Sequence, residues 1–149
     1  MTLENCRVRN VKESDLSSIY LIELKSFKYP YPLQLFVFYY KLSPETFIVV
    51  ECSSNVVGYA IGLIEGDVGH IISLAVDPKF RGRGLGKLLL RELEKRLVSA
   101  GAKVFKLEVS VNNLIALRMY TSLGYRVVNL IRNYYPDGSD AYLMIKEAT

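Results

Sequence analysis

One stretch in the middle of the chain limits the possible fold more than any other feature. Residues 71–76 read Ile-Ile-Ser-Leu-Ala-Val, an apolar run typical of a buried strand. Residues 81–87 follow as Arg-Gly-Arg-Gly-Leu-Gly-Lys, and leucines at helical spacing then continue as far as Ala100. A strand, a basic glycine loop and a helix therefore follow one another directly, which predicts a chain that mixes helices with a sheet.

The glycine loop has the properties of a diphosphate-binding site. Backbone N–H groups in the first turn of a helix have no partners within the helix, and the helix dipole adds partial positive charge at that end. Glycines bring the backbone close to an anion, and arginine and lysine supply charge-assisted hydrogen bonds. The spacing does not match the G-x-x-x-x-G-K-[ST] loop of Mg-nucleotide proteins or the G-x-G-x-x-G motif of dinucleotide folds. The alternative is a basic surface turn that opens an ordinary helix.

Size and charge narrow the class of protein. The 149 residues, half of them apolar, suit one domain over residues 1–149. Three cations of the loop contribute to a net charge of only +4, which favours an anionic cofactor over a nucleic-acid surface. Met1–Arg9 lacks the apolar core of a signal peptide, and no apolar stretch reaches the length of a membrane span, so we expect a soluble cytoplasmic protein that contacts no membrane.

The two cysteines, Cys6 and Cys52, have no metal-ligand spacing. Each lies in a strand-like apolar segment, where a free thiol behaves as a small hydrophobic side chain. We therefore expect them to fill the core rather than to form a disulfide, act in catalysis or bind a metal.

Apolar periodicity and turn residues predict the order of elements: strand, two helices, three strands, helix, strand, helix and two strands. This order implies a mixed α/β fold with a central sheet flanked by helices. The expected strands are 6–11, 46–51, 56–65, 69–76, 104–111, 125–133 and 141–146, and the expected helices begin at Leu16, Leu33, Leu85 and Leu114.

Two motifs resemble a known family. The loop at 81–86 resembles the R/Q-x-x-G-x-G/A loop with which the GNAT superfamily of acyl-CoA-dependent N-acyltransferases holds coenzyme A, and the order of elements is that of the GNAT fold. The run Leu-Glu-Val-Ser-Val-Asn-Asn at 107–113, continued by Ala116, Tyr120 and 123–125, is similar to RimI-like and archaeal N-terminal protein acetyltransferases. The resemblance implies a mostly antiparallel sheet, acetyl-CoA as co-substrate, no metal, and a protein α-amine as acceptor.

The resemblance also assigns the coenzyme A contacts. The backbone of the strand that precedes the loop is expected to pair with pantetheine, and one of its N–H groups, that of Val76, to polarise the thioester carbonyl. Asn113 is expected to contact pantetheine as well as to cap a helix. The expected contacts are Leu74, Ala75, Val76, Arg81, Gly82, Arg83, Gly84, Leu85, Gly86, Lys87, Asn113 and Tyr120.

Three side chains are candidates for proton transfer. An α-amine has a pKa of about 8, so it is mostly protonated at neutral pH and must lose a proton before it attacks a thioester. The resemblance places the general base at Glu108 and assigns to Tyr120 the protonation of the departing thiolate. His70, the one histidine, could share the base role because imidazole titrates near neutrality. The alternatives are that Glu108 is a solvated strand carboxylate, that Tyr120 is a packing residue and that His70 is structural.

Two proline-stiffened aromatic loops, at 27–32 and 132–136, are expected to form the peptide cleft. The chain has eleven tyrosines and no tryptophan, and several of the tyrosines lie in these two loops. The alternative is that these tyrosines only pack against the protein, with their hydroxyl ends in solvent. The resemblance implies a cleft that admits a chain end, lined by Phe27, Tyr29, Tyr31, Tyr134 and Tyr135.

The predicted activity is direct acetyl transfer from acetyl-CoA to the N-terminal amine of a nascent chain or a ribosomal protein, through a ternary complex and a tetrahedral intermediate. The same fold also serves lysine and small-amine acetyltransferases, and a coenzyme A-binding regulatory module without turnover is the alternative from another class. A monomer or weak dimer is expected, with no direct contact to nucleic acid.

Overall fold

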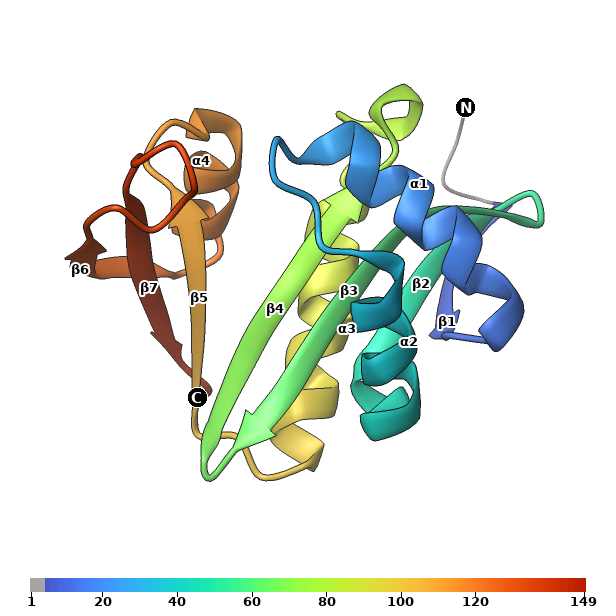
Figure 1. Ribbon diagram of the computed structural model, residues 1–149. Coiled ribbons are helices and arrows are strands. Elements are labelled where there is room, and N and C mark those ends of the chain that lie inside the picture. The colour runs from blue at the N-terminus through green and yellow to red at the C-terminus, as the bar shows by residue number, and fades with distance from the viewer. Residues whose placement is uncertain (1–4) are drawn as a thin grey trace.

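A computed structural model describes residues 5–149 as a twisted sheet with helices on both faces (Figure 1). Within those residues seven strands pair in the order β1-β2-β3-β4-β5-β7-β6. All neighbouring pairs are antiparallel except β4 and β5, so the predicted mixed, mostly antiparallel sheet is confirmed. The strands are Cys6–Asn10 (β1), Phe47–Cys52 (β2), Asn55–Glu65 (β3), Val68–Val76 (β4), Val104–Ser110 (β5), Arg126–Ile131 (β6) and Ala141–Glu147 (β7).

The helices follow the predicted order. Gly124 follows the last helix and has a φ of +100°, a backbone conformation that glycine adopts without strain. The α-helices are Leu16–Ser26 (α1), Leu33–Leu42 (α2), Leu85–Ser99 (α3) and Leu114–Ser122 (α4), and short 3-10 turns cover Glu13–Asp15 (η2), Pro44–Thr46 (η3) and Pro78–Phe80 (η4). None of the helices in the described range is long and apolar enough to cross a bilayer.

Two hydrophobic cores lie on opposite faces of the sheet. On one face, α3 buries five leucines against β2, β3 and β4, and Tyr120 of α4 joins the same cluster. On the other face, α1 and α2 cover β2 and β3, with Phe36 and Tyr59 in edge-to-face contact at 5.7 Å between ring centroids. Each helix therefore buries one apolar stripe and leaves the other side to solvent.

The sheet divides between β4 and β5. These two strands pair over only three positions, from Val68 with Val104 to His70 with Lys106, and then diverge toward their C-terminal ends (Figure 1). The pairing of β4 with β3 also shifts register at Ile72, so β4 carries one extra residue there. Because side chains alternate along a strand, this extra residue puts His70 on the same face as Ser73 and Ala75.

The prediction for the cysteines was wrong, because Cys6 and Cys52 form a disulfide. The two residues are 46 positions apart, but the antiparallel pairing of β1 with β2 places them directly opposite each other. Spacing along the chain excludes a metal site but says nothing about cross-strand neighbours, which depend on register.

Candidate active site

The glycine loop joins the end of β4 to the start of α3. Gly82 and Gly84 have φ angles of +79° and +81°, and a Cβ added at either would meet no atom within 4 Å. These two glycines are therefore required by the backbone conformation rather than by space. Gly86 differs, since a Cβ there would lie 3.1 Å from the Met119 sulfur, so the third glycine brings α3 and α4 close together.

The basic residues of the loop have different surroundings. Arg81 donates from Nε to the Val76 carbonyl at 2.9 Å and from Nη2 to the Ser26 hydroxyl at 3.0 Å, so it ties the loop to β4 and α1. Arg83 lies over the Phe80 ring at 5.2 Å. Its Nη1 is the one buried side-chain nitrogen or oxygen within residues 5–149 that has no hydrogen-bond partner. A buried guanidinium donor without an acceptor suits the binding of an anion.

The backbone of β4 is open on the side of β5 beyond His70. Asp77 N–H donates to the Val57 carbonyl at 2.7 Å, so the backbone of Asp77 faces β3. Backbone groups alternate in direction along an antiparallel ladder, which turns the N–H groups of Val76 and Leu74 toward β5 and that of Ala75 toward β3. Because β5 has already diverged there, the N–H groups of Leu74 and Val76 and the Leu74 carbonyl form a strand edge without partners in residues 5–149, whereas the Val76 carbonyl accepts from Arg81.

His70 and Glu108 lie together where β4 and β5 separate. His70 Nε2 is 2.8 Å from Glu108 Oε1, and His70 Nδ1 is 3.0 Å from Glu65 Oε2. The half-buried side chains of Lys106, Glu108 and Ser110 alternate with the buried residues of β5. Burial lowers the pKa of His70, but the two carboxylates more than compensate, so that its pKa is raised. The site thus pairs an imidazole with a carboxylate at the end of the open strand edge.

Tyr120 and Asn113 lie on α4. The Asn113 side chain accepts a hydrogen bond from Ala116 N–H at 3.1 Å, which confirms the predicted N-cap. Tyr120 is 8% exposed and contacts the Tyr125 ring edge-on, with the centroids 5.8 Å apart. Burial raises the pKa of Tyr120 to about 12, so this phenol keeps its proton at neutral pH and is available as a donor.

The two aromatic loops meet in space. Lys28 Nζ is 3.1 Å from an Asp137 carboxylate oxygen, and the Tyr29 and Tyr135 rings stack with their centroids 6.4 Å apart. The loops belong to opposite sides of the divergence between β4 and β5 (Figure 1).

The aromatic loops also lie near the carboxylate of Glu108. Burial and then the charge of Glu108 raise the pKa of Tyr134. Tyr31 is affected by burial first and by the same charge among others, which together raise its pKa to about 12. Phe27 packs against the core under α1 and α2, whereas Tyr29, Tyr31 and Tyr134 remain exposed enough to contact a substrate.

Sequence reasoning missed Glu23, a carboxylate of α1 that is only 2% exposed. It accepts the Tyr31 N–H at 3.0 Å and the Ser73 hydroxyl at 3.2 Å, and it also accepts the Tyr59 hydroxyl. A charged residue at a buried position of an amphipathic helix was the available signal, because such a position is rarely charged unless its carboxylate is hydrogen-bonded.

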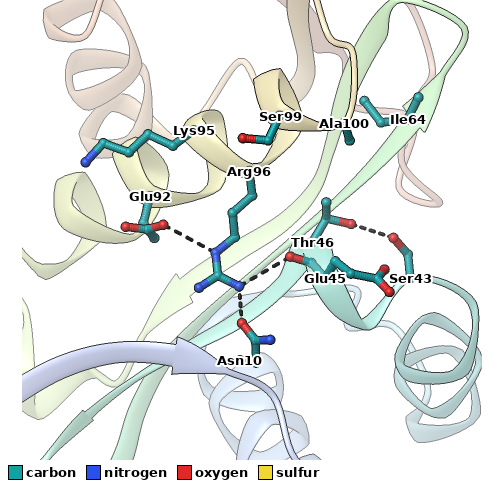
Figure 2. Close-up of a pocket in the computed structure, with 10 residues that line it drawn as sticks. All are labelled: Asn10, Ser43, Glu45, Thr46, Ile64, Glu92, Lys95, Arg96, Ser99 and Ala100. Carbon is teal, nitrogen blue, oxygen red and sulfur yellow. Dashed lines mark hydrogen bonds and ion pairs between the residues drawn. The ribbon is translucent and has the colours of Figure 1, made fainter.

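A separate hollow of about 650 Å³ lies near the C-terminal end of α3, next to β1 and η3 (Figure 2). Arg96 is already engaged there, with Glu92 at 3.3 Å, with the Glu45 carbonyl at 3.3 Å and with Asn10. The hydrogen bonds of Arg96 connect α3 to β1 and η3. None of the residues proposed for the acetyl-transfer site lines this hollow.

An open strand edge beside a glycine loop, a helix N-terminus and a histidine–carboxylate pair define a coenzyme A-dependent N-acyltransferase. The chain belongs to the acetyltransferase (GNAT) family, whose model matches residues 16–125. An uncharacterized N-acetyltransferase of Methanocaldococcus jannaschii is 42% identical over 94% of this chain and 90% of its own length. An N-alpha-acetyltransferase of Sulfurisphaera tokodaii is 34% identical over 93% of this chain and 90% of its own length.

The predicted likeness to RimI-like and archaeal enzymes is confirmed by two further comparisons. The ribosomal protein bS18-alanine N-acetyltransferase of Escherichia coli is 30% identical over 92% of this chain and 94% of its own length. The crystal structure of Ard1 from Thermoplasma volcanium superposes with a TM-score of 0.92, at 28% identity over 96% of this chain and 97% of the other.

Proposed function

We propose that this protein transfers the acetyl group of acetyl-CoA to the α-amine at the N-terminus of a protein. One juxtaposition carries the proposal. The open edge of β4 runs from the glycine loop toward the His70–Glu108 pair, and the two aromatic loops meet close to Glu108. A thioester lying along that edge would present its carbonyl beside Val76, and an amine arriving between the loops would meet Glu108.

The loop residues fit the pyrophosphate of coenzyme A. Gly82 and Gly84 expose backbone N–H groups at the start of α3, where the helix dipole favours an anion. Arg83 offers a buried donor that lacks a partner within the described residues, and Lys87 adds positive charge on the first turn. Arg81 holds the loop to β4 and α1, and Leu85 is buried in the core, so only its backbone is free for the ligand.

The strand edge supplies hydrogen bonds to the rest of the co-substrate. The N–H and carbonyl of Leu74 and the N–H of Val76 are backbone groups of the kind that pair with pantetheine amides, whereas the Val76 carbonyl is held by Arg81. The Val76 N–H is proposed as the donor that stabilises negative charge on the carbonyl oxygen during attack. Asn113, at the start of α4, is proposed as a further pantetheine contact.

Proton transfer is assigned to Glu108 and Tyr120, with His70 in a supporting role. Glu108 takes a proton from the substrate ammonium, either directly or through water, and the free amine then attacks the thioester carbonyl. Tyr120 gives its proton to the departing thiolate, for which its raised pKa keeps it protonated. His70 donates to Glu108 and orients it. The bond to sulfur breaks as the amide forms, so neither a metal nor a covalent enzyme intermediate is required.

The aromatic loops favour a chain end as the acceptor. The Lys28–Asp137 ion pair and the Tyr29–Tyr135 stack join the loops, which would hinder the passage of a continuous polypeptide. Tyr31 and Tyr134 carry hydroxyls that can bind the backbone of the first substrate residues.

The proposed physiological acceptors are nascent chains or a ribosomal protein, met in the cytoplasm. This part of the proposal is supported by the ribosomal-protein activity in the name of one relative. Residues 1–149 are proposed to act as one acetyltransferase domain, in a monomer or weak dimer.

The test is acetyl transfer to short peptides that differ only at the first residue and that each contain one internal lysine. Mass spectrometry locates the acetylated nitrogen. Acetylation of the α-amine that is lost in Glu108→Gln and retained in Glu92→Gln, a change in an ion pair on α3, supports the proposal. Acetylation of lysine alone, or coenzyme A binding without transfer, refutes it.

A further inference from the structure

His70 lies between two carboxylates. Its Nδ1 is 3.0 Å from Glu65 Oε2, and its Nε2 is 2.8 Å from Glu108 Oε1. An ionised carboxylate only accepts hydrogen bonds, whereas a neutral imidazole has one donor nitrogen and one acceptor nitrogen. Both contacts can be hydrogen bonds at the same time only when the ring carries both of its protons.

We propose that Glu65 is a positioning residue that keeps His70 doubly protonated, so that Glu108 alone accepts the proton of the substrate amine. This inference rests on the proposed function and gives the reason why His70 does not share the base role with Glu108. Glu65 acts through His70, because the hydrogen bond and ion pairs of its side chain within residues 5–149 are with His70 and Lys106, and none is with Glu108.

The groups around His70 come from several elements. Glu65 lies at the end of β3, and Lys106 and Glu108 lie on β5. Lys106 Nζ is 3.4 Å from Glu65 Oε1, which leaves Oε2 to His70. The remaining titratable groups that face the two carboxylates are phenols, namely Tyr39 near Glu65 and Tyr31, Tyr134 and Tyr135 near Glu108.

The charges of these groups favour an imidazolium. Two carboxylates and one ammonium leave a net charge of −1 around the ring. The phenols are neutral at physiological pH, and burial raises their pKa further above it. The carboxylates raise the pKa of His70 in spite of its burial. The Glu65 pKa is lowered by the same contact, so both members of this hydrogen bond favour their charged forms.

The arrangement leaves one oxygen of Glu108 for the substrate. Oε1 accepts from His70, whereas Oε2 has no protein hydrogen-bond partner in the described part of the chain. The amine proton passes to this carboxylate, and His70 keeps its own two protons throughout. Without Glu65 the ring would lose a proton more easily. Loss of the proton at Nε2 would weaken the hydrogen bond from His70 to Glu108, and a neutral ring with a free lone pair at either nitrogen could act as a second base.

The protonation state of His70 can be measured directly. The chain has one histidine, so the untagged protein gives a single Hε1 signal by proton NMR, and its titration belongs to His70 without ambiguity. We expect its titration midpoint to lie above the ordinary value of about 6.5 and to fall by about 0.5 to 1 pH unit in Glu65→Gln. The matched control is Glu92→Gln, which removes a carboxylate of comparable exposure from an ion pair on α3 and leaves the midpoint unchanged. An unchanged midpoint in Glu65→Gln overturns the proposal.

Kinetics show whether Glu65 acts through His70. We expect Glu65→Gln to lower kcat by about 3- to 10-fold while the KM values for peptide and acetyl-CoA stay the same. On a His70→Gln background the same change causes no further loss, because the residue it positions is gone. Full additivity of the two changes overturns the proposal. The NMR titration needs no substrate, so it remains interpretable even if the acceptor is not an α-amine.

Discussion

Replacement of Glu23 is the sharpest test of how the aromatic loop at 27–32 is held in position. Its buried carboxylate accepts hydrogen bonds from the Tyr31 backbone, the Ser73 hydroxyl and the Tyr59 hydroxyl. Glutamine at this position could keep one oxygen on Tyr31 N–H and turn its NH₂ group to the two hydroxyls, which can accept as well as donate. Glu23→Gln therefore loses charge assistance but no contact, whereas Glu23→Ala removes all three contacts.

The magnitudes follow from these contacts. Hydrogen bonds to a charged group contribute about 1.5 to 3 kcal/mol each, against about 1 kcal/mol for neutral ones. We expect Glu23→Gln to lower the free energy of unfolding by about 1 to 2 kcal/mol, which for a domain of this size lowers Tm by about 2 to 8 °C. Glu23→Ala should cost about 2 to 4 kcal/mol, since Tyr59 and Ser73 keep their mutual contact at 3.0 Å but Tyr31 N–H loses its partner.

The assay combines thermal unfolding with steady-state kinetics. We expect both variants to raise the KM for peptide, more so for Glu23→Ala, and to leave the KM for acetyl-CoA unchanged. Tyr59→Phe is the control, because it removes a donor to Glu23 and leaves the loop contact in place; it should lower Tm without changing the KM for peptide. An unaltered KM for peptide in Glu23→Ala would refute the argument that this carboxylate positions the loop.

Three further outcomes are expected. Tyr120→Phe keeps the ring contact with Tyr125 and lowers kcat by about 10²- to 10⁴-fold, measured by coenzyme A release, with little change in Tm. Gly84→Ala and Gly66→Ala each place a side chain at positive φ and lower stability by about 1 to 2 kcal/mol in urea unfolding, but only Gly84→Ala weakens coenzyme A binding in calorimetry. His70 has a raised pKa in the folded protein, so its contribution to stability is complete below about pH 6.5 and is lost as the pH rises through the folded value. The difference in unfolding free energy between wild type and His70→Gln should thus be larger at pH 5.5 than at pH 9.

Local patterns were enough to predict most of the elements. The leucine spacing of α3, the alternation of β5 and the Asn113 cap are local properties of the chain, and the structure has each of them. The glycine loop could also be recognised from the sequence, but the role of Gly86 in letting the Met119 side chain of α4 approach α3 closely could not. A contact between two helices depends on tertiary packing, which a glycine motif does not encode.

The features that sequence reasoning missed depend on strand register or on how a helix packs against the sheet. The Cys6–Cys52 disulfide requires the register of β1 on β2. The environment of Glu23 requires α1 to pack over Ser73 of β4, and the Glu65–His70 contact requires the turn between β3 and β4 to bring two charged side chains together. The partners of these side chains are set by register and tertiary packing, so composition and periodicity alone cannot identify them.

The short junction between β4 and β5 has a mechanical consequence. Only three residue pairs join strands β1–β4 to the part of the sheet formed by β5, β7 and β6. The two parts are therefore connected by a narrow seam, at the N-terminal ends of β4 and β5. A co-substrate that pairs with the free edge of β4 would extend this seam and stiffen the whole sheet. We therefore expect coenzyme A to slow amide hydrogen exchange in strands on both sides of the divergence, including strands that it does not touch.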